Sequence, residues 1–390
     1  MLITGQKQLD AQIKAFAAHD FITVDTEFLR EKTYYPKLCL IQIGAPDKEA
    51  VAIDPLADHL DLTPVYDLLA NEKVLKVFHA ARQDLEIFFN LTGKVPTPIF
   101  DTQIAAMVCG YGDSVGYEAL VRNITGHSLD KSAQYTDWSN RPLSDKQITY
   151  ALGDVTYLVD LYEHLKAQLD KQGRTSWVYQ EEEILSDPKT YSVDFQNLWQ
   201  KIKIRSPKPK NLAVLRELAI WREEEAQKRN LPRPWVMRDE TLADMASQIP
   251  QTLEAMKKIR GFSADQAKGK IGQALLVSIK TALAGDPKDW PQPKKKKPLP
   301  PTASATVDIL RMLLKIQSAQ HGVAAKLIAS SEDLEQLAVK EAPDIPALKG
   351  WRAEIFGREA QALKKGLLSI GLKDNKIVKL HVGKDTKTYG

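Results

Sequence analysis

The stretch FITVDTEFLREKTYYPKLCLIQIG, residues 21–44, decides the fold of the N-terminal part of this 390-residue chain. Two runs rich in β-branched and apolar residues, 21–27 and 37–44, flank a short polar connection, and a third run follows at 49–53. Such runs are typical of β-strands. Because the connections between them are short, we expect the three strands to be antiparallel neighbours.

Downstream of these strands the pattern changes to an alternation of strands and helices. Strands that alternate with helices pair in parallel, because each connection crosses back over the sheet. The sequence therefore predicts a mixed sheet covered by helices, which is an α/β domain. The elements expected here are helices near 62–71 and 82–90, strands at 74–78 and ending at Asp101, and further helices to about residue 170.

From about residue 206 onward, no run has comparable strand character, and apolar residues recur with helical spacing. Two sets of helices are expected, each with a long helix, two short ones and a long final one, an order compatible with a diverged duplication. The expected helices are 212–228, 242–247, 252–257 and 264–284 in the first set, and 304–318, 323–328, 331–340 and 352–372 in the second.

The segment between the two helical sets, 285–302, combines six prolines with the lysine run 294–297, which predicts an extended linker. The lysine run either binds a polyanion or simply keeps the linker solvated. The resulting division of the chain is an α/β domain 1–187, a first helical domain 206–284, the linker 285–302, a second helical domain 303–372 and a polar tail 373–390.

The charges are divided unevenly along the chain. Residues 1–187 carry 17 Lys and Arg against 28 Asp and Glu, a net charge of −11, whereas residues 188–390 carry 37 against 22, a net charge of +15. This division favours an acidic domain joined to a basic region that attracts a polyanion, of which nucleic acid is the default. Uneven solvation of an ordinary mixed surface is the alternative.

The composition also excludes several classes of protein. No stretch approaches the roughly 18 apolar residues that a membrane-spanning helix needs, and the first residues, MLITGQKQLD, lack the pattern of a signal peptide. Two cysteines, Cys39 and Cys109, are too few for a disulfide framework or, alone, for a zinc site. We therefore expect a cytoplasmic protein without a membrane partner.

Two carboxylates, Asp25 and Glu27, stand at the end of the apolar strand run 21–24. Residues two apart on a strand project from the same face, so these side chains lie together and repel each other. A divalent metal ion between them relieves that repulsion. The alternative is a turn in which Asp25 only caps the strand end.

Two further acidic positions follow the same logic. Asp84 lies in the first turns of a helix just beyond the strand 74–78, and strand ends of α/β sheets are where ligands bind. Tyr150 and Asp154 are four residues apart in a helical stretch and therefore share one helix face. Taken singly, Asp84 is more often a partner of the helix dipole, and Tyr150 with Asp154 more often belongs to an ordinary amphipathic helix.

The order Asp-x-Glu, Asp and Tyr-x-x-x-Asp resembles the tyrosine-bearing subgroup of the DEDD exonuclease superfamily. More narrowly, DTEFLREKTYYPKLCLIQIG, HAARQDLEIFF, FDTQIAA and DWSNRPLSDKQITYALGD are similar to segments of the ribonuclease D family. The resemblance implies a ribonuclease H-like mixed sheet in the 3′–5′ exonuclease domain 1–187. It also implies helical domains of the helicase-and-RNase-D C-terminal (HRDC) type in 206–284 and 303–372.

Carried over residue by residue, the resemblance assigns the metal-binding carboxylates and the water-positioning tyrosine. The family more often has alanine than glycine at Gly153, a departure that removes no ligand. The implied metal ligands are Asp25, Glu27, Asp84 and Asp154, with Tyr150 completing the catalytic set.

The implied activity is hydrolysis of RNA from its 3′ end, releasing nucleoside 5′-monophosphates by a two-metal-ion mechanism. Oxygen ligands favour two Mg²⁺ or Mn²⁺ ions. The implied substrates are RNAs with a single-stranded 3′ extension, above all transfer-RNA precursors. Because three nucleic-acid-facing domains need no symmetry, we expect a monomer.

Residues that contact the substrate are harder to assign from the sequence. Phe28 and Leu29 are candidates to stack on the terminal bases, although core packing is the better interpretation of Leu29. Trp138 and Arg141 either contact the strand or build a structural loop, and Asp101 is a supporting acidic position. Candidate phosphate contacts are Lys208, Lys210, Arg229, Arg233, Arg238, Lys257, Lys258, Arg260, Lys268 and Lys270.

Two other functions compete with this one. A DNA-directed repair exonuclease shares the same carboxylates and chemistry, and HRDC-type domains also serve DNA. A non-catalytic nucleic-acid-binding scaffold is the second alternative, and the intact acidic set argues against it because the loss of one ligand is the simplest route to inactivity.

Overall fold

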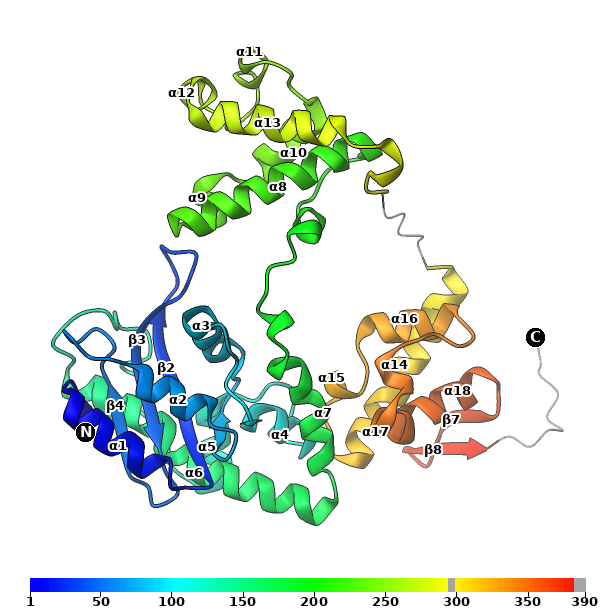
Figure 1. Cartoon of the computed structure of the whole chain (residues 1–390). Helices are drawn as coiled ribbons and strands as arrows, with labels where there is room; N and C mark the ends of the chain where they lie inside the picture. Colours follow the sequence, from blue (N-terminus) through cyan, green and yellow to red (C-terminus); the bar gives the residue numbers. More distant parts are fainter. Residues whose placement is uncertain (294–298, 382–390) are drawn as a thin grey trace.

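A six-stranded mixed sheet forms the centre of the N-terminal domain in the computed structural model, which describes residues 1–293 and 299–381 (Figure 1). The strand order is β1-β4-β3-β2-β5-β6. Strand β2 is antiparallel to β3 and parallel to β5, so the predicted mixed α/β sheet is confirmed. The strands are β1 (Leu2–Ile3), β2 (Phe21–Leu29), β3 (Lys37–Gly44), β4 (Ala50–Ile53), β5 (Leu75–Phe78) and β6 (Ile99–Asp101).

Helices cover both faces of this sheet, and the alternation of side chains along β2 separates the two faces. Ile22 and Val24 are buried in the core that also contains residues of α1, α2 and α3. Thr23 points the other way and donates a hydrogen bond to the Val155 carbonyl of α6. The helices are α1 (Gln6–Phe16), α2 (Thr63–Ala70), α3 (Arg82–Thr92), α4 (Thr102–Val108), α5 (Tyr117–Thr125), α6 (Asp145–Gln172) and α7 (Thr175–Ser186).

The first helical domain packs its helices around one apolar core. That core contains Leu215 and Leu218 of α8, Met245 of α10 and Ile279 of α13. The 3₁₀ helix Phe195–Lys201 lies against α8 and links this domain to the N-terminal domain. The helices are α8 (Pro209–Arg229), α9 (Arg233–Val236), α10 (Asp239–Gln248), α11 (Leu253–Met256), α12 (Ala264–Lys268) and α13 (Lys270–Ala284).

The second helical region corrects one expectation. The predicted long helix over 352–372 ends at Lys364, and a β-hairpin follows it, so this region is not all-α. Residues 373–381 of the expected polar tail belong to this hairpin, and the rest of that tail, like the whole lysine run 294–297, lies outside the described residues. The elements are α14 (Pro301–His321), α15 (Ala325–Ile328), α16 (Ser331–Val339), α17 (Gly350–Arg352), α18 (Arg358–Lys364), β7 (Leu368–Lys373) and β8 (Lys376–His381).

The hairpin has a local physical cause. Asp374 and Asn375, at its tip, both have positive φ angles, the conformation that two-residue hairpin turns require. Leu368 of β7 is buried in the core of the second helical region and anchors the hairpin there. The turn pair Asp374-Asn375 was therefore the sequence signal for the hairpin. The helical spacing of the residues before this pair favoured a helix instead.

Both helical regions contact the N-terminal domain. The loop 30–36 between β2 and β3 reaches α8 of the first region, where the backbone N–H of Tyr34 donates to the Asn230 side chain. In the second region, Trp351 stacks on Trp177 of α7 with ring centroids 4.6 Å apart. In the part of the chain that the structure describes, no helix has the length and apolar character to span a membrane.

Candidate active site

Strand β2 places two carboxylates on the face of the sheet that α6 covers. Asp25 pairs with Gln42 of β3 and Glu27 with Leu40. The register shifts between Glu27 and Phe28, so the strand is irregular directly after the second carboxylate. Such irregularities redirect side chains at the ends of strands.

Helix α6 brings a third carboxylate to the same place. The Thr23 hydroxyl donates to the Val155 carbonyl over 2.8 Å, which fixes the helix against β2 one residue beyond Asp154. A Cβ atom at Gly44 would lie 2.5 Å from the Thr23 Oγ1 atom and 3.1 Å from the Val155 carbonyl oxygen. The close approach of helix and sheet therefore requires glycine at position 44. As a result, carboxylate oxygens of Asp25, Glu27 and Asp154 lie within 4.8 Å of one another.

Asp84 approaches this cluster from the N-terminal end of α3. Its side chain is 6% exposed and accepts a hydrogen bond from the Thr26 hydroxyl, which lies between the two acidic residues of β2. Burial raises the pKa of Asp84, and the charge of the nearby Asp25 carboxylate raises it further. The structure therefore brings together all four carboxylates that the sequence singled out.

Burial and mutual repulsion raise the pKa values of this cluster. Burial raises the pKa of Glu27 to about 10, with Asp25, Asp154 and Asp84 adding to the shift. Burial raises the pKa of Asp154 to about 7, and burial and then Asp154 raise the pKa of Asp25. Carboxyls whose pKa values are raised in this way retain protons at or above neutral pH unless a cation neutralises them. An all-carboxylate oxygen set fits Mg²⁺ or Mn²⁺ in charge and in ligand type.

Tyr150 is directed to Asp154 on the same face of α6. Its hydroxyl donates a hydrogen bond to the Asp154 carboxylate, and burial, followed by the charge of Asp154, raises the pKa of Tyr150. The Trp138 ring packs beside the tyrosine ring with centroids 6.1 Å apart. The phenol therefore stays protonated at neutral pH and is a hydrogen-bond donor at the carboxylate cluster.

A cavity of about 550 Å³ opens over these groups. Phe28 lines it, as does Tyr135, whose side chain is 92% exposed at the rim. The sequence analysis missed Tyr135, His79 and Tyr117, which also line the cavity. His79 directly precedes the second motif, and Tyr135 lies in the polar segment before the third, so proximity to the motifs was the available signal.

Two of the expected substrate contacts turn out to build the loop before α6. Trp138 is 2% exposed and packs in a core cluster with Leu29 at its edge. The Arg141 guanidinium makes two 2.6 Å bonds to the buried Asp54 carboxylate and a 2.7 Å bond to the Cys39 carbonyl. The Trp138 ring is buried, with its indole N–H unpartnered among the described residues, and the Arg141 guanidinium is engaged by Asp54 and Cys39. The structural interpretation of Trp138, Arg141 and Leu29 is therefore favoured over the substrate-binding one.

Asp101 has a supporting position beside the site. Its carboxylate accepts hydrogen bonds from the backbone N–H groups of Ala80 and Ala81, just before α3, and from that of Gln103 in α4. It therefore joins the starts of the two helices and holds the loop that leads to Asp84.

Comparisons with family models divide the chain in the same order. A family described as 3′–5′ exonuclease matches residues 1–170, and the HRDC domain family matches residues 211–279.

Several relatives match over nearly the whole chain. Ribonuclease D of Nitrobacter hamburgensis is 47% identical over 380 residues, which are 97% of this chain and 99% of that protein. Ribonuclease D of Bartonella henselae is 45% identical and aligns over 96% of this chain and 93% of that protein. The crystal structure of Escherichia coli RNase D, described as an exoribonuclease involved in structured RNA processing, superposes with a TM-score of 0.79 at 30% identity, covering 94% of this chain and 98% of that one.

Proposed function

This chain belongs to the ribonuclease D family and is a 3′–5′ exoribonuclease that uses divalent metal, and from that premise we propose that it works by a two-metal-ion mechanism on small structured RNAs. The observation that carries this proposal is the convergence of carboxylates from β2, α3 and α6 on one partly buried cluster. When bound, two Mg²⁺ or Mn²⁺ ions supply the charge that activates the attacking water and stabilises the leaving 3′ oxygen.

The residues of the site have separate roles in this proposal. Asp25, Glu27, Asp84 and Asp154 would hold the ions through their carboxylate oxygens. Tyr150 orients the attacking water through its hydroxyl, whose proton is retained at neutral pH.

Phe28 lines the cavity beside the carboxylates and offers an apolar face to the terminal base. The product is a nucleoside 5′-monophosphate, because the attack at phosphorus breaks the bond to the 3′ oxygen of the preceding nucleotide.

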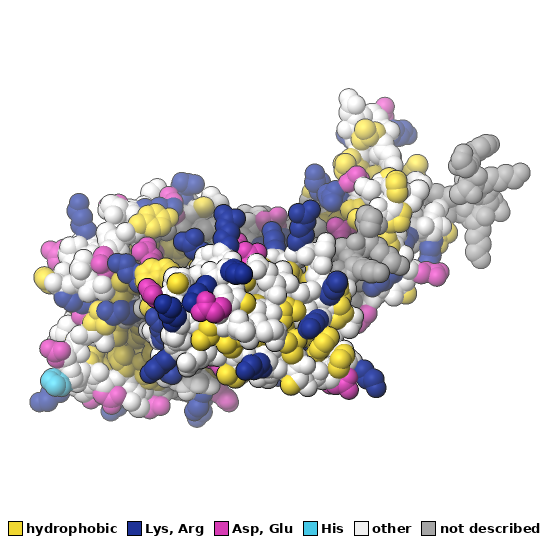
Figure 2. All heavy atoms as spheres, turned by 90° about the horizontal axis from the view of Figure 1, so that it is seen from above, with side chains coloured by type: hydrophobic (Ala, Val, Ile, Leu, Met, Phe, Trp, Pro, Cys, Tyr) yellow, Lys and Arg dark blue, Asp and Glu magenta, His cyan; other side chains and the backbone are white. Residues whose placement is uncertain are grey.

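The first helical domain contributes the electrostatic attraction for RNA. Residues 206–284 carry 14 Lys and Arg against 9 Asp and Glu, and Figure 2 shows basic side chains spread over the face of the molecule seen from above. Such a surface binds phosphates without regard to sequence and loses affinity with salt. We propose that residues 303–372 are a second HRDC-like domain, since α14, α15 and α16 follow the order of a long helix and two short ones expected from the first.

The preferred substrates in this proposal are transfer-RNA precursors with a short single-stranded 3′ extension. The test is a time course on such a precursor labelled at its 5′ end, beside a matched single-stranded DNA, with Mg²⁺, Mn²⁺ or EDTA. Stepwise 3′ shortening of the RNA that stops near the folded stem and is abolished by EDTA is the expected result. Preferential digestion of the DNA would instead identify a repair exonuclease, and binding without digestion in either metal would identify a scaffold.

Metal binding has an independent readout in the thermal stability of the protein. A ligand that binds only the folded state raises the melting temperature. We expect Mn²⁺ and Mg²⁺ to raise the Tm of the wild type, and more at pH 8 than at pH 6, because protons compete for the same carboxylates. The Asp25→Asn variant, which keeps the shape of the side chain, should lose most of this shift. Sedimentation in the same buffers tests the expected monomer.

A further inference from the structure

A second cavity, of about 670 Å³, lies beside the active site between α3, the segment 190–201 and α8. We propose that this cavity binds the single-stranded part of the RNA substrate upstream of the bond being cleaved. The proposal rests on the proposed function, since it assigns the path of the same substrate.

The cavity adjoins the active site through two shared elements. At the end of β2, Phe28 lines the active-site cavity and Arg30 lines the second cavity. At the start of α3, Gln83 faces the first cavity and Arg82 the second. Two residues of a β-strand span about 6–7 Å. An RNA strand held in the active site therefore reaches the second cavity within a few nucleotides.

The cavity carries positive charge that the protein leaves unpaired. Arg30 is neutralised by Glu86 through two bonds of 2.9 and 2.7 Å. Arg82 and Lys201 are exposed, and within the described ranges 1–293 and 299–381 no carboxylate forms an ion pair with either. Two cations in one cavity that lack carboxylate partners are suited to contacting the phosphates of one nucleic-acid strand.

Aromatic side chains in the same cavity supply faces for bases. Tyr35 is 37% exposed, and Tyr191 packs beside Phe89 with ring centroids 5.8 Å apart. Stacking on aromatic rings holds single strands without regard to sequence. The combination of free cations and aromatic rings therefore points to a single strand.

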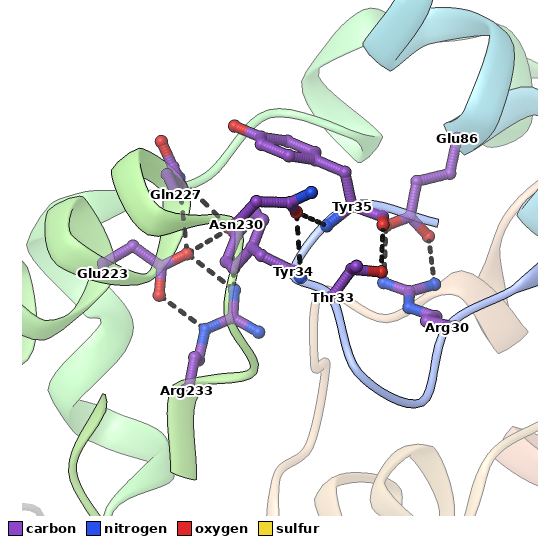
Figure 3. A network of polar contacts seen from close by, with 9 residues as sticks. All are labelled: Arg30, Thr33, Tyr34, Tyr35, Glu86, Glu223, Gln227, Asn230 and Arg233. Carbon is purple, nitrogen blue, oxygen red and sulfur yellow. Dashed lines mark hydrogen bonds and ion pairs between the residues drawn. The ribbon is translucent and has the colours of Figure 1, made fainter. Parts of the chain in front are cut away.

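A polar network, hereafter the loop–helix network, fixes the upper wall of the cavity (Figure 3). The Asn230 side-chain oxygen accepts hydrogen bonds from the backbone N–H groups of Tyr34 and Tyr35 over 3.1 and 3.0 Å. The Tyr34 hydroxyl donates to the Glu223 carboxylate, which also pairs with Arg233. Because the loop is held at both backbone and side chain, the cavity is formed before the strand arrives, which lowers the entropic cost of binding.

The test compares RNA lengths and two neighbouring lysines. Lys201→Ala removes a cation from the cavity, whereas Lys203→Ala removes an exposed lysine two residues away that does not line it. Binding of a 5′-labelled RNA decamer is measured by fluorescence anisotropy in EDTA at several salt concentrations. Hydrolysis of the decamer and of an RNA dinucleotide in Mg²⁺ is measured in parallel.

For Lys201→Ala we expect weaker decamer binding, with the slope of log affinity against log salt reduced by about 1, and wild-type rates on the dinucleotide. Tyr35→Ala should weaken decamer binding about 5-fold or more through lost stacking. Lys203→Ala should retain wild-type binding and salt dependence.

Equal losses for Lys201→Ala and Lys203→Ala would overturn the proposal, because the effect would then be general electrostatics. Unchanged decamer binding in both Lys201→Ala and Tyr35→Ala would also overturn it. A wild type that binds the decamer but hydrolyses neither RNA would instead contradict the proposed function.

Discussion

Tyr150 and Asp154 show how one helical turn combines a metal ligand with a proton donor. The hydroxyl donates to the carboxylate, and burial of both groups raises both pKa values. Trp138 packs against the tyrosine ring and limits its movement. The hydrogen bond therefore needs no rearrangement when the water is positioned.

Replacing Tyr150 with phenylalanine tests this role. The ring and its packing remain, but the hydroxyl that contacts the attacking water is lost, so we expect kcat to fall about 10²-fold with little change in KM. Steady-state kinetics on the transfer-RNA precursor in Mg²⁺ measures both parameters. Tyr179→Phe, which removes a hydroxyl from the exposed residue Tyr179 of α7, is the control and should retain full activity. Wild-type kcat in Tyr150→Phe would remove the tyrosine from the mechanism.

Glu182 makes the stability of the protein depend on pH. It is 3% exposed, its Oε1 atom accepts a 2.5 Å hydrogen bond from the Asp101 backbone N–H, and burial raises its pKa from 4.5 to about 9. The unfolded chain releases this proton near pH 4.5, whereas the folded protein keeps it until about pH 9. Between these values the folded state binds more protons, so the free energy of unfolding falls as the pH rises, by at most about 1.4 kcal/mol per pH unit.

Glu182→Gln removes this titration and keeps the acceptor oxygen. We expect the loss of stability between pH 5.5 and 8.5 to be smaller in the variant than in the wild type, as measured by the midpoint of urea unfolding at both pH values. Glu183→Gln changes an exposed neighbour and should behave as the wild type. Parallel pH dependences for Glu182→Gln and the wild type would show that Glu182 does not titrate abnormally.

At the scale of elements, the approach of α6 to the sheet sets the geometry of the active site. Gly44→Ala places a methyl group against the Thr23 hydroxyl and the Val155 carbonyl, so the helix must move away from β2 and carry Asp154 with it. We expect kcat/KM to fall at least about 10-fold, since small displacements of catalytic groups are costly. The Mn²⁺-induced rise in Tm should fall as well.

Gly153→Ala is the matched control on the same helix. A Cβ atom at Gly153 meets nothing within 4 Å, and alanine stabilises a helix interior by about 0.5–1 kcal/mol over glycine. This variant should have wild-type activity and an equal or higher Tm. Comparable losses of activity in both glycine variants would mean that the distance between α6 and the sheet does not explain the effect of Gly44→Ala.

The elements of the sheet were predictable because their signals are local. The strands expected at 37–44 and 49–53 match the observed ones to within a residue, since each is a continuous apolar run between turns. By contrast, β1 has two residues and shows no periodicity. The helix expected over 352–372 was wrong because local spacing continued into the hairpin sequence, where Asp374 and Asn375 reverse the chain.

The candidate site was predictable to the extent that its residues lie in short motifs. The carboxylates and Tyr150 belong to such motifs, and spacing alone places Asp25 beside Glu27. The roles of Trp138 and Arg141 depend on distant partners. The Arg141 guanidinium pairs with Asp54, 87 residues away, and no local pattern encodes that contact.

At the scale of the whole molecule, both helical regions contact the catalytic domain, and each does so through different residues. Arg352 of the second region pairs with Glu181 of α7, and the Ala324 backbone N–H donates to the Met107 carbonyl of α4. The first region contacts the catalytic domain through the loop–helix network around Asn230. Because this loop continues directly from the strand that carries Asp25 and Glu27, the position of the first helical domain is coupled to the strand of the active site.

Asn230→Gly separates this coupling from the stability of the helical domain. Asn230 ends α8 with a φ of 48°, a conformation that glycine adopts freely, so the helix end is preserved while both side-chain bonds to the loop are lost. We expect amide hydrogen exchange at Tyr34 and Tyr35 to accelerate about 10-fold or more, with unchanged protection in α13. Slow exchange at both amides in the variant would contradict a loop held by Asn230. Loss of protection throughout α8 and α13 would mean instead that Asn230 stabilises the helical domain itself.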